Sequence, residues 1–398
     1  MAAQFLQIHT LTHYPASLLN RDDAGFAKRM PFGGDVRTRI SSQCLKRHWR
    51  VYDGENSLKS VDAPESIRSR VSFDRFVVQP LVGEGVDERV ARVAAQKLAD
   101  KLLGTEAKRE KARKKGKKDN AEDPAENKED KIVRTAQVTV LGKPELDYLC
   151  RIAREAIAAV DGSPDKVEAE LDKRTDDKEL KKNLKALKAG SLSAGLGAAL
   201  FGRMVTGDFL ADANAAIHVA HAMTVHGQRT ESDYFTAIDD LVREEGEQGS
   251  GHINTAELTS GLFYGYVVVD VSGLVNNLGD NRELAGDVVQ RLVHIVSTVS
   301  PGAKKGSTAP YAYSHLVLVE GGKAQPRTLQ NAFIEPVKTK GNVVREAYDA
   351  LHSHIKELDD MYGRNERRAH AGLYTDGRFE NRKTLAELAE WARSQVLE

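Results

Sequence analysis

A cluster of basic residues near the start of the chain is the clearest chemical signal in the sequence. Residues 28–50 contain seven lysines and arginines and one acid, Asp35. A solvated protein surface usually mixes acids with bases, whereas a surface that binds a polyanion concentrates positive charge in a local patch. The composition therefore supports two interpretations about equally well: a nucleic-acid-binding surface and an ordinary basic face of the protein.

The elements that would position these residues are a short strand and a helix. Residues 36–40 alternate basic and apolar side chains, which is typical of a strand, and Ser41 and Ser42 are helix-capping residues. On the helix that follows, Leu45, Trp49 and Tyr52 share an apolar face. The opposite face carries Gln43, Lys46, Arg47 and Arg50. The free amides and the positive dipole of the helix N-terminus would attract an anion to the same place.

Length and composition predict a soluble globular protein with a sizeable core. The chain has 398 residues, of which 40% are hydrophobic and 29% charged, and its net charge is +0. This length accommodates two or three domains, or one large domain with insertions. Its two cysteines, Cys44 and Cys150, are far apart, so neither a disulfide framework nor a cysteine zinc site is expected. No signal-peptide pattern and no apolar run of membrane-spanning length occurs, and we expect a cytoplasmic protein.

Residues 60–190 have the apolar spacing of a mostly helical block. Within it, residues 104–131 contain ten lysines and arginines, eight acids and no aromatic residue. Such a segment has too little to bury, so we interpret it as a solvated, disordered insertion. Further on, residues 214–226 alternate like a strand, residues 232–242 look like a short helix, and residues 246–251 are rich in glycine. This order suggests a protruding hairpin-like arm.

The order of strands and helices fits an α+β sheet of RNA-recognition type. Tyr264 and Tyr266 overlap part of the aromatic strand motif of such domains, where bases stack on exposed rings. The leading basic–glycine pair and the last aromatic residue of that motif are missing. Tyrosines in a strand more often pack in the core, so both interpretations stay open.

Two metal sites can be considered. His218, His221 and His226 invite a zinc interpretation, but on a strand His221 points away from the other two, and no cysteine is near. Asp22 and Asp23 could hold Mg²⁺ for RNA cleavage, since paired carboxylates suit a hard cation. Loop acids beside an arginine more often cap backbone amides, so we expect no metal site.

A series of short motifs, in order along residues 4–310, resembles the backbone subunit of the type I-E CRISPR Cascade complex, the CasC family. The motifs that carry the resemblance are Leu19-Asn20-Arg21-Asp22-Asp23, Phe32-Gly33-Gly34, Arg39-Ile40-Ser41-Ser42-Gln43, Leu45-Lys46-Arg47, Gly202-Arg203-Met204, Ala220-His221-Ala222, Phe235-Thr236-Ala237, Asp239-Asp240-Leu241, Ser260-Gly261, Phe263-Tyr264 and Pro301-Gly302-Ala303-Lys304. The resemblance is weak through residues 55–190 and loose after residue 340.

The resemblance implies a hand-shaped α+β fold with an RNA-recognition-motif-like (ferredoxin-like) palm, a helical fingers insertion and a β-hairpin thumb. The corresponding boundaries are residues 1–58 for the first part of the palm and 59–190 for the fingers, including the charged insertion 104–131. Residues 191–203 return to the palm, 204–252 form the thumb, and 253–398 form the second part of the palm and the C-terminal helices.

The resemblance also implies the function and the site. Copies of the family's subunit stack head to tail along CRISPR RNA, and the thumb displaces one nucleotide at regular intervals. Phosphates would be held by Arg21, Ser41, Gln43, Lys46, Arg47 and Arg50, with Lys304 near the RNA. Met204, at the base of the arm, and Phe235, on its short helix, would wedge beside the displaced base.

The expected partners are CRISPR RNA, further copies of the chain in a helical filament, other Cascade subunits, and target DNA through pairing with the guide. No catalytic residue, metal or cofactor is expected, and no membrane. The alternative is a metal-dependent RNase that uses Asp22 or Asp23, because related type III backbone subunits cut target RNA.

Overall fold

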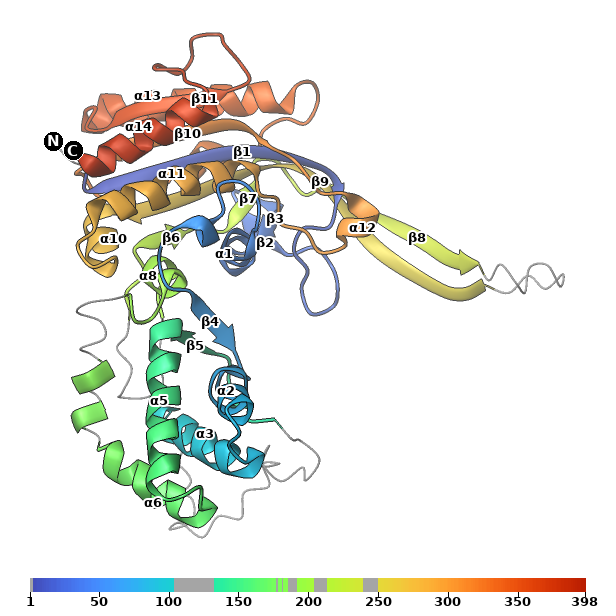
Figure 1. Cartoon of the computed structure of the whole chain (residues 1–398). Helices are drawn as coiled ribbons and strands as arrows, with labels where there is room; N and C mark the ends of the chain where they lie inside the picture. Colours follow the sequence, from blue (N-terminus) through green and yellow to red (C-terminus); the bar gives the residue numbers. More distant parts are fainter. Residues whose placement is uncertain are drawn as a thin grey trace. The chain divides into compact units, whose positions relative to one another are not determined.

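The computed structural model describes residues 3–103, 132–176, 178–180, 182–184, 192–203, 213–238 and 250–398, with side chains left out for residues 235–238 and 250–254. The chain forms two compact units (Figure 1). Unit 1 comprises residues 1–61, 217–272 and 282–398, and unit 2 comprises residues 62–216 and 273–281. The charged insertion 104–131 and Met204 lie outside the described residues.

Unit 1 is built on an antiparallel sheet. Its strands are β1 (Phe5–Ser17), β2 (Arg29–Phe32), β3 (Asp35–Ile40), β6 (Ile217–Val219), β7 (Ala222–Thr224), β8 (Thr230–Ile238), β9 (Ser250–Asp270), β10 (Ser314–Gly322) and β11 (Arg367–Gly372). The strand order is β11-β10-β1-β9-β7-β3-β2, and β6 and β8 also pair with β9. The long central strands form because residues 5–11 and 261–271 are rich in β-branched and aromatic side chains.

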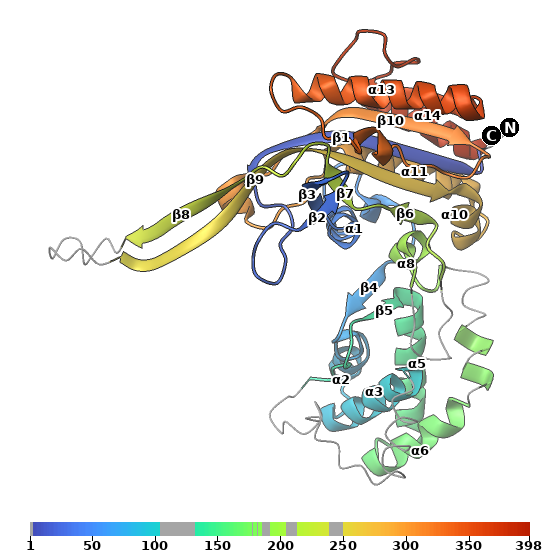
Figure 2. The ribbon, with the colours of Figure 1, turned by 180° about the vertical axis from the view of Figure 1, so that it is seen from behind.

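Helices cover both faces of this sheet. Unit 1 contains α1 (Ser42–Val51), α11 (Arg282–Thr298), α12 (Lys305–Thr308), α13 (Val343–Tyr362) and α14 (Leu385–Leu397), with short 3₁₀ turns at Leu58–Ser60 and Gln330–Phe333. Figure 1 and Figure 2 show α13 on one side of the sheet and α11 on the other. Because side chains alternate along a strand, Ile8, which lies opposite Val319 and Val267, faces the α11 side, while Leu11 packs in the cluster under α13.

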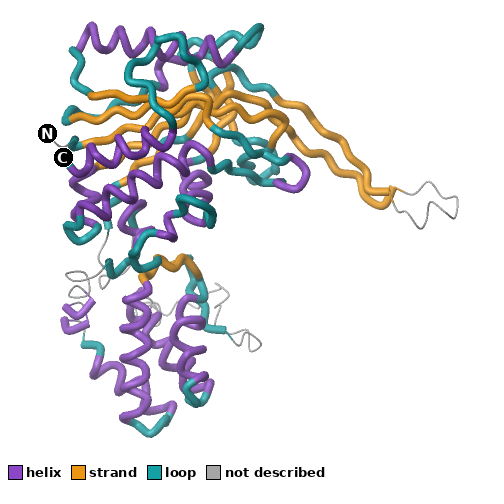
Figure 3. Tube along the Cα trace, turned by 45° about the horizontal axis from the view of Figure 1, so that its top comes forward, coloured by secondary structure: helices purple, strands orange, loops and turns teal. Residues whose placement is uncertain are grey.

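A long hairpin extends from the sheet where β8 pairs with the first half of β9 (Figure 3). The described pairing runs from Thr230 opposite Thr259 to Ile238 opposite Ser250. The short helix predicted over residues 232–242 is therefore wrong for its described part, because residues 232–238 are strand. The Tyr-Phe-Thr sequence there has high strand propensity. Its local pattern is compatible with helix or strand, and cross-strand pairing with β9 stabilises the strand.

Two further differences from the sequence prediction concern the sheet. The predicted strand over 214–226 is split into β6 and β7, and the register against β9 shifts by one residue between Val219, opposite Val267, and Met223, opposite Tyr264. Such a bulge re-aims the side chain at the break, which here is His221. Strand β11 was missed entirely, because its basic sequence (RRAHAG) lacks an apolar alternation.

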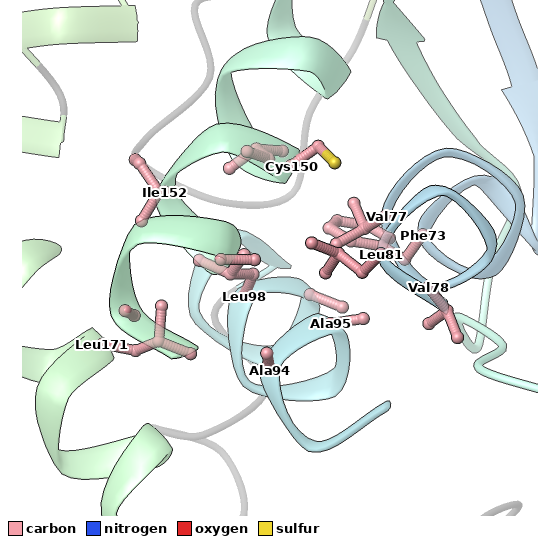
Figure 4. Close-up of a cluster of buried hydrophobic side chains, with 14 of the residues drawn as sticks. Phe73, Val77, Val78, Leu81, Ala94, Ala95, Leu98, Cys150, Ile152 and Leu171 are labelled. Atoms are coloured by element: carbon pink, nitrogen blue, oxygen red, sulfur yellow. The ribbon is translucent and has the colours of Figure 1, made fainter. Parts of the chain in front are cut away.

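Unit 2 is mostly helical. It contains α2 (Gln79–Gly83), α3 (Glu88–Leu103), α5 (Lys143–Ala159), α6 (Pro164–Arg174) and α8 (Leu196–Phe201), and a π-helical turn at Asp74–Val78. A two-stranded antiparallel sheet pairs β4 (Ser66–Ser69) with β5 (Thr139–Gly142). Helix α10 (Val271–Asn277) begins at the end of β9. Figure 4 shows the core of unit 2, a cluster of buried side chains that includes Leu98 of α3, Ile152 of α5 and Leu171 of α6.

Unit 2 also contains a buried ion pair. Arg203 donates to both carboxylate oxygens of Glu145, with the shorter N···O distance 2.6 Å, and both side chains are 2% exposed. Glu145 also accepts the Gly142 N–H at the start of α5. Arg203 thus belongs with unit 2, as do all described residues of 192–203, which the sequence analysis assigned to the palm.

The part of the chain that the structure describes contains no helix long and apolar enough to cross a lipid bilayer.

Candidate nucleic-acid interface

Helix α1 begins and orients itself as its sequence predicts. Ser41 is the N-cap, and its Oγ accepts the Cys44 N–H at 3.2 Å. Leu45 and Trp49 are buried on one face of the helix. On the other face Gln43 and Arg47 are exposed and Lys46 and Arg50 are half-buried, so the polar side of the helix lies at the surface of unit 1.

The loop that carries Arg21 is tied to the beginning of α1. The Asn20 side-chain oxygen accepts the Ser41 N–H at 2.9 Å, and the Asn20 carbonyl accepts the Lys28 N–H, also at 2.9 Å. A backbone bridge between Arg21 and Ala27 closes the loop. Because these bonds fix both ends of the loop, exposed Arg21 is held on the same side of unit 1 as the helix N-terminus.

The same loop is also anchored to the root of the long hairpin. Glu257 of β9 is 8% exposed, and its carboxylate accepts the Ala27 N–H at 2.6 Å. A charge-assisted bond of this kind is about twice as strong as a neutral one. The position of Arg21 therefore depends on a strand more than 200 residues away in the sequence.

Not every arginine of the basic cluster faces the surface. Arg37 is completely buried, and its guanidinium donates to the carbonyls of Phe32, Thr224 and Phe333 at 2.9–3.3 Å. Burial lowers the pKa of Arg37, and the charge of Asp35 raises it. This arginine joins three segments of unit 1 and cannot contact an external ligand.

The β2–β3 turn explains part of this burial. Gly33 has φ +61° and Gly34 φ +79°, as a two-residue hairpin turn requires. A Cβ on Gly33 would lie 1.7 Å from the Ile334 carbonyl oxygen. Only glycine allows this close approach, which brings the Phe333 carbonyl to Arg37.

Further cations gather beside α1. The Arg39 N–H donates to the Lys28 carbonyl at 2.7 Å, so the two basic residues are neighbours. Burial lowers the pKa of His221, and the charges of Arg39 and Lys28 lower it further. Burial likewise lowers the pKa of His48, with Lys305 and Arg47 acting in the same direction. Through His221, which contacts the Ser42 N–H, these effects place Lys28 and Arg39 beside the start of α1. Through His48 they place Arg47 and Lys305 beside its last turn.

Lys304 lies at the N-cap of α12, in the loop that approaches α1. The Ala303 N–H donates to the Leu18 carbonyl at 2.9 Å, and Pro301 lines a small cavity together with Leu45 and Trp49 of α1. The loop is thus held between the end of β1 and the helix. The structure brings Arg21, Ser41, Gln43, Lys46, Arg47, Arg50 and Lys304 to one region of unit 1.

The family model for CT1975-like protein matches residues 6–393. The chain belongs to the CT1975-like protein family. The resemblance to the Cascade backbone family, stated from the sequence motifs, is thereby confirmed as a family relationship.

Solved structures match the fold of this family member over nearly its full length. One, titled CRISPR RNA-guided surveillance complex, pre-nicking, has a TM-score of 0.76 and 25% sequence identity, covering 98% of this chain and 100% of that chain. A second, titled CRISPR RNA-guided surveillance complex, has a TM-score of 0.67 and 21% identity, covering 98% and 99%. No curated protein matches the sequence significantly.

The placement of the two predicted wedge residues beside bound RNA stays a prediction. Met204 lies outside the described residues, and Phe235 lies on β8, opposite Asn254 of β9, with its side chain outside the description. Phe235 is thus on a strand of the long hairpin and not on a short helix.

Base stacking on Tyr264 is ruled out, and its packing interpretation is confirmed. Tyr264 is fully buried; its hydroxyl bonds to His9 Nδ1 at 2.8 Å and accepts the Leu329 N–H at 2.9 Å. Burial raises the pKa of Tyr264 far above its usual value. The half-buried Tyr266 donates to the Gln7 side chain at 2.7 Å. The segment around Leu329 and helix α13 covers this sheet face, which the local strand pattern could not reveal.

His221, His226 and Asp22, three of the residues considered as metal ligands, have other partners. His221 Nδ1 lies 3.3 Å from both Arg39 and the Ser42 N–H, and His226 bonds to Gly227 and Leu262. Asp22 accepts the Phe26 N–H at 2.9 Å, so this acid caps its own loop. Among the described residues no three histidine, cysteine or acidic side chains cluster as metal ligands would.

Three cations beside α1 were not among the predicted site residues: Lys28, Arg39 and Lys305. Lys28 and Arg39 were within the counted basic cluster, and the Phe32-Gly33-Gly34 turn signalled the hairpin that brings these two residues together. The only sequence signal for Lys305 was its position directly after Lys304, which was a predicted site residue.

Proposed function

We propose that this protein is a CRISPR RNA-binding backbone subunit of a type I-E Cascade surveillance complex. Copies stack head to tail along the guide RNA and present it in segments for pairing with target DNA. The observation that carries the proposal is the acid-poor group of cations along α1, in a chain whose fold matches whole chains of CRISPR RNA-guided surveillance complexes.

The geometry of α1 suits the RNA backbone. The helix N-terminus offers amides and a positive dipole to a phosphate, and Arg21, Lys46 and Arg47 add charge nearby. Phosphate contacts are independent of base sequence, as a subunit that binds every guide requires.

The strand order supports the palm, fingers and thumb assignments. Strands β10-β1-β9-β7 follow the 4-1-3-2 order of a ferredoxin-like sheet, with α1 after the first strand and α11 before the last. The β8–β9 hairpin corresponds to part of the proposed thumb, and residues 62–190 of unit 2 to the proposed fingers. Met204 and Phe235 are proposed to wedge beside a displaced nucleotide.

Head-to-tail stacking suits a subunit whose copies must cover an extended RNA. A heterologous interface that does not close into a ring generates a helical filament, which matches an extended RNA. Target sequence is then recognised by base pairing of the guide, so the protein needs no base-specific contacts. The partners are therefore CRISPR RNA, further copies of the chain and the other Cascade subunits, and the subunit is a scaffold without a catalytic role.

Co-purification tests this function. The full chain, expressed with the other subunits of its complex and a CRISPR array, should retain CRISPR RNA that sequencing identifies as repeat-flanked guides. Recovery of the folded chain without RNA, or with RNA of arbitrary origin, would contradict the proposal. Mg²⁺-dependent cleavage of a paired RNA target, lost in Asp22→Asn or Asp23→Asn, would favour the RNase alternative.

Chemical probing tests the wedge. In the assembled complex, Met204→Ala combined with Phe235→Ala should weaken the regular pattern of hyper-reactive nucleotides while circular dichroism stays unchanged. The matched control is Tyr234→Ala, the exposed neighbour on β8. An unchanged pattern in the double variant would show that these two residues do not displace a nucleotide.

A further inference from the structure

Two tyrosines between α12 and β10 are among the most exposed aromatic residues of the described chain. Tyr311 is 71% exposed and Tyr313 is 74% exposed, and a single residue separates them. Isolated exposed apolar residues are common on soluble proteins, but two such rings next to each other mark an interaction surface. Neither tyrosine belongs to the group of residues assigned above to RNA binding.

The backbone that presents these rings is held in place. Ala312, between them, donates its N–H to the Ser300 Oγ at 2.9 Å, and the same hydroxyl donates to the Ala312 carbonyl at 3.1 Å. Ser300 is 6% exposed, and Pro310, just before Tyr311, is buried. Because the chain on either side is anchored, the rings are held outward by an ordered segment.

The electrostatic surroundings favour a nucleic acid over a protein as the partner. Residues 299–319 contain no aspartate or glutamate, and they include Lys304 and Lys305. This segment also reaches α1: Pro301 lines a small cavity together with Leu45 and Trp49 of that helix. The charge of Lys305 lowers the pKa of His48 further, after burial. Aromatic rings next to cations are the usual means of binding single-stranded nucleic acid, since rings stack on bases and cations attract phosphates.

We propose that Tyr311 and Tyr313 form a stacking platform for bases of the same single-stranded RNA whose phosphates are held by α1. This inference rests on the proposed function, and it adds a second kind of contact to it. Stacking tolerates any base, because every base has a π-face, so the platform would not restrict the guide sequence.

The test compares RNA affinities of full-length variants at several salt concentrations. Tyr311→Ala combined with Tyr313→Ala should raise the Kd for a single-stranded RNA by about tenfold, which is equivalent to the loss of one stacked base. The slope of log K against log salt should not change, since no phosphate contact is lost. Tyr311→Phe with Tyr313→Phe keeps both rings and should bind like wild type, as should the control Tyr362→Ala, an exposed tyrosine of α13.

The outcomes separate this inference from the proposed function. If Lys46→Ala weakens binding while the double alanine variant binds like wild type, the platform is wrong and the proposed function stands. If wild-type protein itself binds no RNA, both are wrong. If the double alanine variant keeps its RNA affinity but loses self-association, the tyrosines contact another copy of the chain, which also overturns the platform.

Ultraviolet cross-linking of wild-type protein to RNA decides the question if the double alanine variant misfolds. A cross-link at Tyr311 or Tyr313 supports the platform, and cross-links confined to other residues overturn it.

Discussion

Two regions of unit 1 are rich in arginine and lysine, and they use these residues in opposite ways. On the sheet face beneath α13, Arg327 and Arg368 both donate to Glu320, at 2.7 and 2.5 Å, and Glu320 is completely buried. Arg368 also donates to Asp359. Beside α1, by contrast, Lys28, Arg39 and Arg47 form no ion pair with a carboxylate in the described part of the chain.

The difference shows where each set of charges finds its counter-ions. Buried cations and the acids that pair with them neutralise one another inside the fold. They contribute to specific packing and produce little electrostatic potential outside the protein. Cations gathered without acids repel one another and attract an external anion. The Glu320 network therefore belongs to the stability of unit 1, and the α1 surface belongs to ligand binding.

The largest expected effect comes from removing the acid of the buried network. Glu320→Gln should lower the free energy of unfolding by about 3–5 kcal/mol, because it leaves two partly buried arginines without their shared counter-ion. Urea titration measures this loss. The RNA affinity of the folded fraction should stay at the wild-type value.

A matched control sharpens this result. Glu283 is exposed and pairs with Arg393, so Glu283→Gln should cost no more than about 1 kcal/mol. An equal loss for both variants would contradict the role given to the Glu320 network.

The same network predicts a pH dependence. Burial alone would raise the pKa of Glu320, but the hydrogen bonds and charges of His9 and Arg327 outweigh it and hold this pKa well below its usual range. A lowered folded-state pKa means that the stabilisation is fully present above the unfolded pKa of about 4.3 and is lost as pH falls through the folded value. The stability gap between wild type and Glu320→Gln should therefore shrink as pH falls below about 4. Urea titrations over this pH range measure the gap, and a constant gap would contradict this assignment.

The sequence predicted α1 well because the signals for that helix are local. The Ser41 cap and the spacing of Leu45 and Trp49 lie within ten residues of one another, and both occur as expected. The same holds for α14, where the Thr384–Glu387 capping box is present.

The predictions from sequence were wrong where contacts with distant segments determine the structure. Arg37 is buried because the carbonyls of Thr224 and Phe333 surround it, and Tyr264 is buried because the segment around Leu329 covers it. Residues 232–238 form a strand because β9 is available to pair with them. No local pattern contains this information, since the partners lie up to about 300 residues away.

The contact between the Arg21 loop and α1 gives a smaller expected effect. Asn20→Ala removes the acceptor for the Ser41 N–H and should weaken RNA binding about threefold to tenfold, because the lost hydrogen bond is worth about 1 kcal/mol and the position of Arg21 becomes less defined. Fluorescence anisotropy with labelled RNA measures the change.

Asn342→Ala is the matched control. Its side chain also accepts a backbone N–H, that of Arg345, but at the start of α13. We expect a similar loss of stability and no loss of RNA affinity. If both asparagine variants weaken RNA binding equally, the loop contact has no specific role.

The smallest effect is expected in the charged insertion. Its ten basic and eight acidic residues nearly balance, so it resembles neither the α1 surface nor the buried network. Deleting residues 106–130 should leave folding and RNA binding nearly unchanged. Loss of soluble protein or of complex assembly would assign this segment a structural role.

The most direct test of the α1 surface is the salt dependence of RNA binding. Lys46→Ala and Arg50→Ala should each lower the affinity for single-stranded RNA of any sequence, and each lost phosphate contact should flatten the slope of log K against log salt by about 0.7. Lys356→Ala, an exposed lysine of α13, is the control and should retain the wild-type slope. If the slopes of both α1 variants equal that of wild type, α1 does not bind the phosphates and the central claim is wrong.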